Sequence, residues 1–148
     1  MAKNMTKVLF VCVESSCRSQ MAEGFAKKFG EGVLEVYSAG SRPSGKVNPE
    51  AIKVVKEASI NISSYKSKGF NELPVKEFDY VITLGCQDLC PFVLAKEHIE
   101  WQIDDPANKS LEFFREVWDD IKNNVKKLIE NIQEAKQKKR GGYDAKTL

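Results

Sequence analysis

The sequence contains a single histidine, His98, which leaves little room for a serine–histidine–aspartate hydrolase site. No apolar stretch approaches the ~20 residues that a membrane-crossing helix needs. The apolar run at residues 8–13 is too short for a secretory signal, and no small-residue cleavage site follows it. The net charge of +2 is too small to indicate a nucleic-acid-binding protein. These absences predict a cytoplasmic protein that binds neither membrane nor nucleic acid.

The four cysteines are unlike those of structural disulfides and of zinc sites. Cys12, Cys17, Cys86 and Cys90 belong to a chain predicted to be cytoplasmic, where structural disulfides are rare. Their gaps of four and three residues are not the paired two-residue gaps of zinc knuckles. We therefore expect no metal and no cofactor, and catalysis or redox exchange remains for these thiols.

Apolar runs alternate with amphipathic stretches along all of the 148 residues, without an internal repeat or a linker. Strands are predicted at 7–13, 34–39, 78–84 and 99–103, and helices at 18–29, 48–58 and 110–138. Part of 92–97 is predicted to be helical, and Gly141 and Gly142 are predicted to end the last helix. The pattern predicts one α/β domain, residues 1–140, with a four-stranded parallel sheet and helices on both faces. Residues 141–148 are predicted to be a flexible tail, and the basic run at 136–140 to be a solvated helix end.

The most informative segment joins the first predicted strand to the first predicted helix. Cys12 is followed by five residues and then by Arg18 and Ser19. Backbone N–H groups of such a loop and the N-terminus of the next helix favour an anion and a thiolate. The oxyanion would be bound by the loop residues, which are Val13, Glu14, Ser15, Ser16, Cys17, Arg18 and Ser19. Cys12 is the predicted nucleophile, Arg18 grips two oxygens of the oxyanion, and Ser19 donates to the thiolate.

Two other segments follow predicted strands and should meet Cys12 at the same edge of the sheet, where parallel α/β sheets bind ligands. Asp105, which precedes a proline, is a candidate acid for a leaving oxygen, with a turn or helix cap as the alternative. Cys86 and Cys90 follow the third strand. They can form a disulfide if their segment is a turn or a helix that loosens, since i and i+4 Cβ atoms of a helix are too far apart. Alternatively they are two small buried residues.

The segment from Cys12 to Gly24, with its run Cys-Arg-Ser-Gln-Met-Ala-Glu-Gly, resembles the low-molecular-weight protein tyrosine phosphatase superfamily, and its arsenate reductase branch most closely. Four other segments match that branch in order, and the resemblance covers about residues 6 to 135; the segments are 36–40, 47–49, 81–84 and 104–107. A cysteine pair after the third strand separates the reductases from plain phosphatases of this superfamily. The resemblance implies the phosphatase-like fold and a role in arsenic detoxification.

The resemblance also implies a relay of three cysteines that converts arsenate to arsenite. Cys12 attacks arsenate, Asp105 assists the loss of water, and Cys86 then attacks the adduct. Cys90 next attacks Cys86, and a thioredoxin-like or glutaredoxin-type reductant reduces the Cys86–Cys90 disulfide. The alternative is a low-molecular-weight phosphatase that uses Cys12, Arg18 and Asp105 and leaves the cysteine pair idle.

Three departures from the family pattern are visible. Val13, Glu14 and Ser15 replace the Thr-Gly-Asn that commonly follows the nucleophile, and the relay cysteines are separated by only three residues. Some members of the family bind potassium at positions that match Ser15, Glu23, Ser38 and Lys68. Because an ammonium cannot ligate a cation, we hypothesise that Lys68 supplies the positive charge and that potassium is dispensable.

Overall fold

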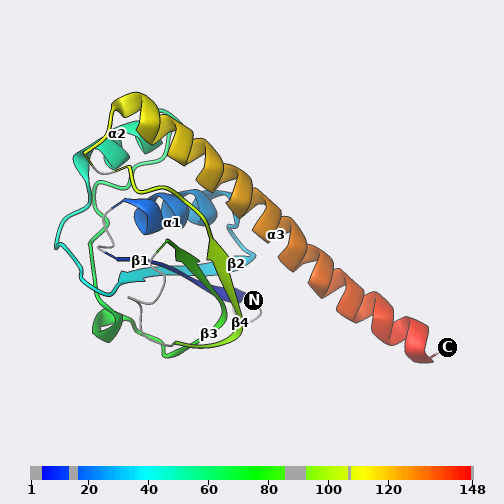
Figure 1. Cartoon of the computed structure of the whole chain (residues 1–148). Coiled ribbons are helices and arrows are strands. Elements are labelled where there is room, and N and C mark those ends of the chain that lie inside the picture. The colour runs from blue at the N-terminus through cyan, green and yellow to red at the C-terminus, as the bar shows by residue number, and fades with distance from the viewer. Residues whose placement is uncertain (1–4, 14–16, 86–92, 107, 148) are drawn as a thin grey trace.

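The computed structural model describes residues 5–13, 17–85, 93–106 and 108–147. Its sheet has four parallel strands in the order β2-β1-β3-β4 (Figure 1); they are β1 (Thr6–Cys12), β2 (Leu34–Gly40), β3 (Glu77–Leu84) and β4 (Leu94–Trp101). The helices of the described residues are α1 (Arg18–Phe29), α2 (Pro49–Lys56), the 3₁₀ helix η2 (Phe70–Glu72) and α3 (Leu111–Thr147). The predicted α/β class and the four-stranded parallel sheet are confirmed.

Strand β1 lies at the centre of the sheet and is apolar on both faces. Val8 and Phe10 pack with the helices in one hydrophobic core, whereas Leu9 and Val11 belong to a second cluster on the opposite face. All of these side chains are at most 1% exposed. A central parallel strand that is buried on both faces therefore appears as an unbroken apolar run, as this one does.

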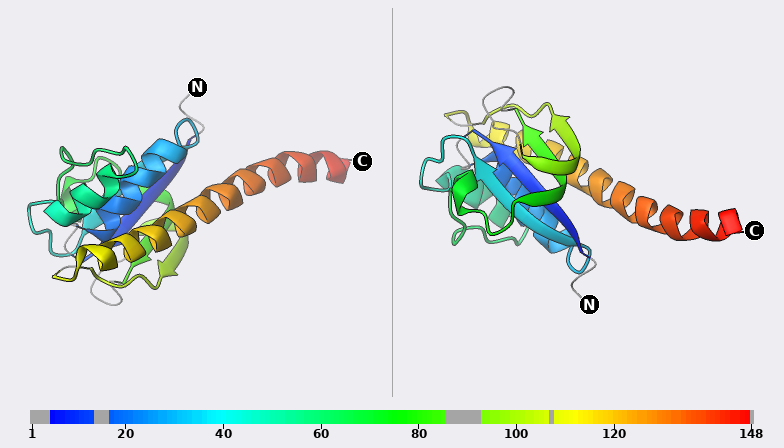
Figure 2. Two further views of the ribbon diagram at one scale, coloured as in Figure 1. Left: turned by 90° about the horizontal axis from the view of Figure 1, so that it is seen from above. Right: turned by 90° about the horizontal axis from the view of Figure 1, so that it is seen from below.

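The two faces of the sheet have different covers. Helices α1, α2 and α3 lie together on one face, as all three views show (Figure 2). On the other face the described cover comes from the segment that contains η2, with Phe70 and Leu73, and from Val93. Among the described residues the three α-helices therefore share one face, and the short 3₁₀ helix η2 belongs to the cover of the other. Helix α2 packs on α1 and α3 through Ala51 and Val54, because its apolar stripe meets theirs.

Strand β4 begins five residues earlier than the sequence predicts. Residues 94–97 pair with β3, with Leu94 opposite Glu77 and Glu97 opposite Tyr80, so they are not helical. Their side chains are mostly exposed, which removes the apolar alternation by which a strand is recognised in a sequence. Backbone hydrogen bonds to β3 make this segment a strand, and the local sequence pattern does not reveal this pairing.

Helix α3 runs to Thr147 and extends past the edge of the sheet (Figure 1). Its predicted end near residue 138 is wrong. A glycine inside a helix costs about 1 kcal/mol relative to alanine, which weakens a long helix without ending it.

The side chain of Asn48 caps α2 by accepting from the N–H of Glu50 at 2.8 Å, and Pro49 follows at the first helical position, as predicted. None of the described helices is apolar over the length that a bilayer requires.

Candidate active site

Cys12 is the last residue of β1, and the side chain is buried at 2% exposure. Its Sγ lies 3.0 Å from the Oγ of Ser19, in the first turn of α1. The thiol donates this hydrogen bond when it is neutral, and the hydroxyl donates it once the sulfur has ionised. Helix α1 thus begins beside the candidate nucleophile, and the N-terminus of a helix favours negative charge.

Arg18 is the first residue of α1 and is also buried, at 7% exposure. Its Nη1 donates to the backbone oxygen of Ile103, at 3.1 Å, and its Nη2 lies 3.7 Å from a carboxylate oxygen of Asp105. Both partners belong to the connection between β4 and α3. The guanidinium is therefore anchored by the main chain on one side and neighbours an exposed carboxylate on the other.

Asp105 meets the other site residues at the carboxyl edge of the sheet, as the strand order predicts. Its side chain is 57% exposed, so it is open to solvent and to a substrate. A carboxyl group at this place can exchange a proton with an oxygen that leaves an anion held by Arg18.

Part of the predicted site lies outside the described residues. Glu14, Ser15 and Ser16 are three of the loop residues, and Cys86 and Cys90 are the predicted relay pair. Of the remaining loop residues, Val13 accepts a backbone hydrogen bond from the N–H of Arg42 at 2.8 Å. Cys17 is buried at 4% exposure and precedes α1, and its carbonyl accepts from the N–H of Met21 at 2.9 Å.

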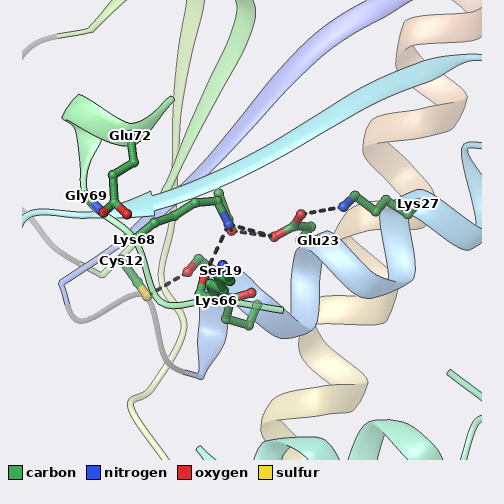
Figure 3. Close-up of polar contacts among 10 residues, drawn as sticks. Cys12, Ser19, Glu23, Lys27, Lys66, Lys68, Gly69 and Glu72 are labelled. Atoms are coloured by element: carbon green, nitrogen blue, oxygen red, sulfur yellow. Dashed lines mark hydrogen bonds and ion pairs between the residues drawn. The ribbon is translucent and has the colours of Figure 1, made fainter. Parts of the chain in front are cut away.

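A buried polar cluster lies behind the nucleophile (Figure 3). Glu23, at 4% exposure, accepts a hydrogen bond from the hydroxyl of Ser38 and pairs with Lys27 at 2.7 Å. The Nζ of Lys68 lies 3.4 Å from the Oγ of Ser38 and 3.9 Å from the Oε1 of Glu23. The structure thus brings together three of the four positions that match the family's potassium site, with an ammonium among them.

Tyr65 borders this cluster and is neutral at physiological pH. Burial raises the pKa of its phenol above the ordinary value of 10.0, although the nearby charge of Lys27 lowers it. The ammonium of Lys27 lies 4.7 Å from the centre of the Tyr65 ring, within the range of a cation–π contact. Lys27, one turn further along α1, thus contacts both the ring of Tyr65 and the carboxylate of Glu23.

The segment at residues 66–68 lies between the helix and the end of β2. The side-chain amide of Gln20 donates to the carbonyl of Lys66 at 2.9 Å, and the N–H of Gly40 donates to the carbonyl of Lys68 at 2.9 Å. Gln20 is fully buried. Sequence reasoning did not identify Gln20, although a polar residue in the first turn of a helix that starts at an anion site is a usable signal.

Gly85 directly follows β3, at the edge of the sheet where the sequence predicts the site, but sequence reasoning gave it no role of its own. A Cβ atom placed on it would lie 2.5 Å from the Nη1 of Arg18. The residue just before Cys86 therefore touches the guanidinium of the candidate site.

The chain matches the family model for low molecular weight phosphotyrosine protein phosphatase over residues 7–138. A protein called glutaredoxin arsenate reductase, from Synechocystis sp., is 44% identical over 131 residues, which cover 86% of this chain and 99% of that protein. An arsenate reductase from Staphylococcus aureus is 44% identical over 128 residues, which cover 82% and 94%.

Solved structures agree with these matches. A structure described as an arsenate reductase in the phosphate binding state is 44% identical and superposes with a TM-score of 0.79, covering 86% of this chain and 99% of that one. The chain is therefore similar to these relatives in both sequence and fold over nearly their whole length.

Proposed function

Because the chain belongs to the low molecular weight phosphotyrosine protein phosphatase family, we propose that it is an arsenate reductase of that family. The observation that carries this proposal is the convergence of Cys12, Ser19 and Arg18 at the N-terminus of α1. The names of two relatives with 44% identity direct the choice of arsenate as the oxyanion.

In the proposed first step the thiolate of Cys12 attacks the arsenic atom of arsenate. A sulfur–arsenic bond forms, and one arsenate oxygen leaves as water after it has taken protons, one of them from Asp105. Arg18 and the N-terminus of α1 stabilise the charge on the remaining oxygens. Ser19, 3.0 Å from the sulfur, holds the thiolate in place for this attack.

In the second step the thiolate of Cys86 attacks the sulfur of Cys12. The sulfur–arsenic bond breaks and its electron pair stays on arsenic, so As(V) becomes As(III) and leaves as arsenite, while Cys12 and Cys86 form a disulfide. The position of Gly85 against Arg18 supports this step, because it places the residue before Cys86 beside the oxyanion site.

In the third step the thiolate of Cys90 attacks Cys86, which releases Cys12 as a thiolate and leaves a Cys86–Cys90 disulfide. A thioredoxin-like reductant then reduces that disulfide with two electrons. The name of the Synechocystis relative supports glutaredoxin with glutathione as the alternative donor. Thiols that must be reduced in each cycle suit a cytoplasmic enzyme.

The test is arsenate-dependent oxidation of NADPH, run once with thioredoxin and its reductase and once with glutaredoxin, glutathione and glutathione reductase. Turnover should occur with one donor and should disappear in Cys12→Ser, Cys86→Ser and Cys90→Ser. Cys90→Ser should still release about one arsenite per chain in a single turnover, because only the third step is blocked. Multiple turnover in Cys90→Ser would contradict the relay.

A phosphatase is the second candidate, and the family match and the Cys12–Arg18–Asp105 arrangement favour it. Hydrolysis of p-nitrophenyl phosphate separates the two functions. Cys86→Ser should lose arsenate reduction and keep any phosphatase activity, because a water molecule can complete hydrolysis without the cysteine pair. Phosphate hydrolysis without arsenate reduction in the unchanged protein would favour the phosphatase.

We also propose that Lys68 takes the place of a potassium ion behind the oxyanion loop, residues 13–19. Its ammonium lies 3.9 Å from the buried carboxylate of Glu23 and 3.4 Å from the hydroxyl of Ser38. A positive charge so close to a buried carboxylate is the compensation that a bound cation would otherwise provide.

A further inference from the structure

Gly85 adopts a conformation that few other residues tolerate. Its φ of +82° lies in the left-handed region, which glycine enters without steric cost. A Cβ atom at this position would lie 2.5 Å from the Nη1 of Arg18 and 3.2 Å from the carbonyl oxygen of Ile103. Both distances are shorter than an ordinary van der Waals contact, so a side chain here would displace one of its neighbours.

These two atoms are the donor and the acceptor of one hydrogen bond. Nη1 of Arg18 donates to the oxygen of Ile103 at 3.1 Å, and the bond passes beside the place where a Cβ of residue 85 would be. The acceptor belongs to the main chain, two residues before Asp105. The guanidinium is the end of a flexible side chain and would move first.

We propose that Gly85 is a positioning residue of the oxyanion site, because its missing side chain leaves room for the hydrogen bond that orients Arg18. This inference rests on the proposed function of Arg18 in oxyanion binding, and it adds a residue that does not itself touch the substrate. An arginine binds two oxygens of a tetrahedral anion only when its planar group faces them, so its orientation controls affinity. A displacement of about 1 Å at such a group can cost about 10²-fold.

The chain offers a control that separates backbone strain from the contact with Arg18. Gly32, in the turn between α1 and β2, has a φ of +81°, and no atom lies within 4 Å of its virtual Cβ. This turn lies at the start of β2, at the opposite edge of the sheet from Cys12. Gly32→Ala therefore introduces the same backbone strain as Gly85→Ala without touching Arg18.

The experiment measures the dissociation constant of inorganic phosphate by calorimetry for the unchanged protein, Gly85→Ala and Gly32→Ala. Both variants should lower the midpoint of thermal unfolding by a few degrees. Only Gly85→Ala should bind phosphate at least ~10-fold more weakly, and Gly32→Ala should stay within about twofold of the unchanged protein. Equal phosphate affinity in all three proteins would overturn the proposal.

Two further variants cover the case in which Gly85→Ala folds poorly. Asparagine tolerates the left-handed region better than alanine does, so Gly85→Asn relieves the strain but retains a Cβ. It should bind phosphate as weakly as Gly85→Ala, and recovery of full affinity would overturn the proposal. In an Arg18→Met background, which lacks Nη1, adding a Cβ at residue 85 should lower the thermal midpoint less than in the unchanged protein.

Failure of this inference and failure of the proposed function give different results. Phosphate binding requires neither Cys86 nor Cys90, so the affinity difference between Gly85→Ala and Gly32→Ala is independent of the relay. A protein that shows this difference but reduces no arsenate would refute the reductase and support the role of Gly85. A protein that reduces arsenate without this difference would do the reverse.

Discussion

Among the residues that the structure describes, two arginines lie beside carboxylates, one in the candidate active site and one on the surface. Arg115, in α3, donates two hydrogen bonds to Glu57 at the end of α2, at 3.1 and 2.8 Å. Arg18 approaches Asp105 no closer than 3.7 Å and donates instead to the carbonyl of Ile103. The surface pair has the better geometry, yet both of its side chains are nearly half exposed.

The comparison shows that a short distance between the charged groups of an ion pair does not indicate a functional site. Water screens the Arg115–Glu57 pair, and exposed pairs of this kind contribute little to stability. Arg18 is buried at the oxyanion loop, where water cannot replace its charge. Its contact with Asp105 leaves room for a third partner, which an oxyanion-binding arginine requires. Five predictions test how the buried site differs from the surface.

The largest effect is expected from exchanging the two arginines for lysine. Arg18→Lys keeps the charge but loses the planar group that binds two oxygens, so kcat/KM for arsenate should fall by about 10²–10³-fold. Arg115→Lys should leave kcat/KM unchanged and serves as the control. An Arg18→Lys variant with nearly full activity would contradict the role of this guanidinium.

The two carboxylates should differ in the same sense. Asp105→Asn removes the proposed acid and should lower kcat by about 10²-fold. Phosphate should bind at least as tightly as before, because the substitution removes a negative charge near the anion. Glu57→Gln, the matched change on the surface, should have no effect on kcat. Steady-state kinetics and phosphate titration of both variants test this, and an unchanged kcat in Asp105→Asn would refute its role as an acid.

A smaller effect is expected behind the oxyanion loop. Lys68→Met leaves the buried carboxylate of Glu23 with one cation fewer and should lower the free energy of unfolding by about 2 kcal/mol. Breaking a fully buried pair costs ~3–5 kcal/mol, and the effect here should be smaller because Lys68 is partly exposed. Lys96, whose ion pair with Asp79 is 3.2 Å long, has an 80% exposed side chain, so Lys96→Met should change stability little. Urea unfolding of both variants measures the difference.

The same hypothesis concerns potassium. If Lys68 supplies the charge, replacing potassium chloride by sodium chloride at equal ionic strength should leave the arsenate turnover of the unchanged protein as it was. A strong dependence of turnover on potassium would show that the ammonium does not replace the ion.

The smallest effect is expected from the surface pair and depends on pH. The hydrogen bond from Arg115 holds the pKa of Glu57 below its ordinary value of 4.5. The pair therefore stabilises the fold at pH values above 4.5, and this contribution is lost as the pH falls through the lowered pKa. The thermal midpoint of Glu57→Gln should be slightly below that of the unchanged protein at pH 7, and this difference should shrink as the pH is lowered below 4.5. A difference that stays constant as the pH falls would exclude this cause.

Much of the fold was predictable because local patterns report it. The start of β1, the span of α1 and the cap at Asn48 all follow from apolar spacing and from the residues at element ends. Strand β4 was predicted too late, because its exposed first half carries no apolar alternation. The end of α3 was predicted too early, because two glycines weaken a helix without stopping it.

The candidate site was predictable to a similar degree. Cys12, Arg18 and Ser19 could be named because they lie at the end of β1 and the start of α1, and Asp105 because it lies in the connection that follows β4 at the same edge of the sheet. Gln20 and Gly85 could not be named, because their importance comes from contacts with Lys66 and Arg18 that are distant in sequence. The structure brings Cys12, Arg18, Ser19 and Asp105 together, and the roles of these residues, like those of Cys86 and Cys90, remain predictions.

Local patterns in the sequence are enough to predict the succession of the four strands and three α-helices along the chain, the placement of Cys12 and Arg18 around one loop, and the family resemblance. These features depend on neighbours within a few residues, where side-chain spacing and backbone preference act directly. Three features depend on the packing of distant segments: the face of the sheet that the α-helices cover, the contact of the Lys68 ammonium with the Glu23 carboxylate, and the room that Gly85 leaves for Arg18. Those contacts join segments that are tens of residues apart, and packing at the edge of the sheet brings them together.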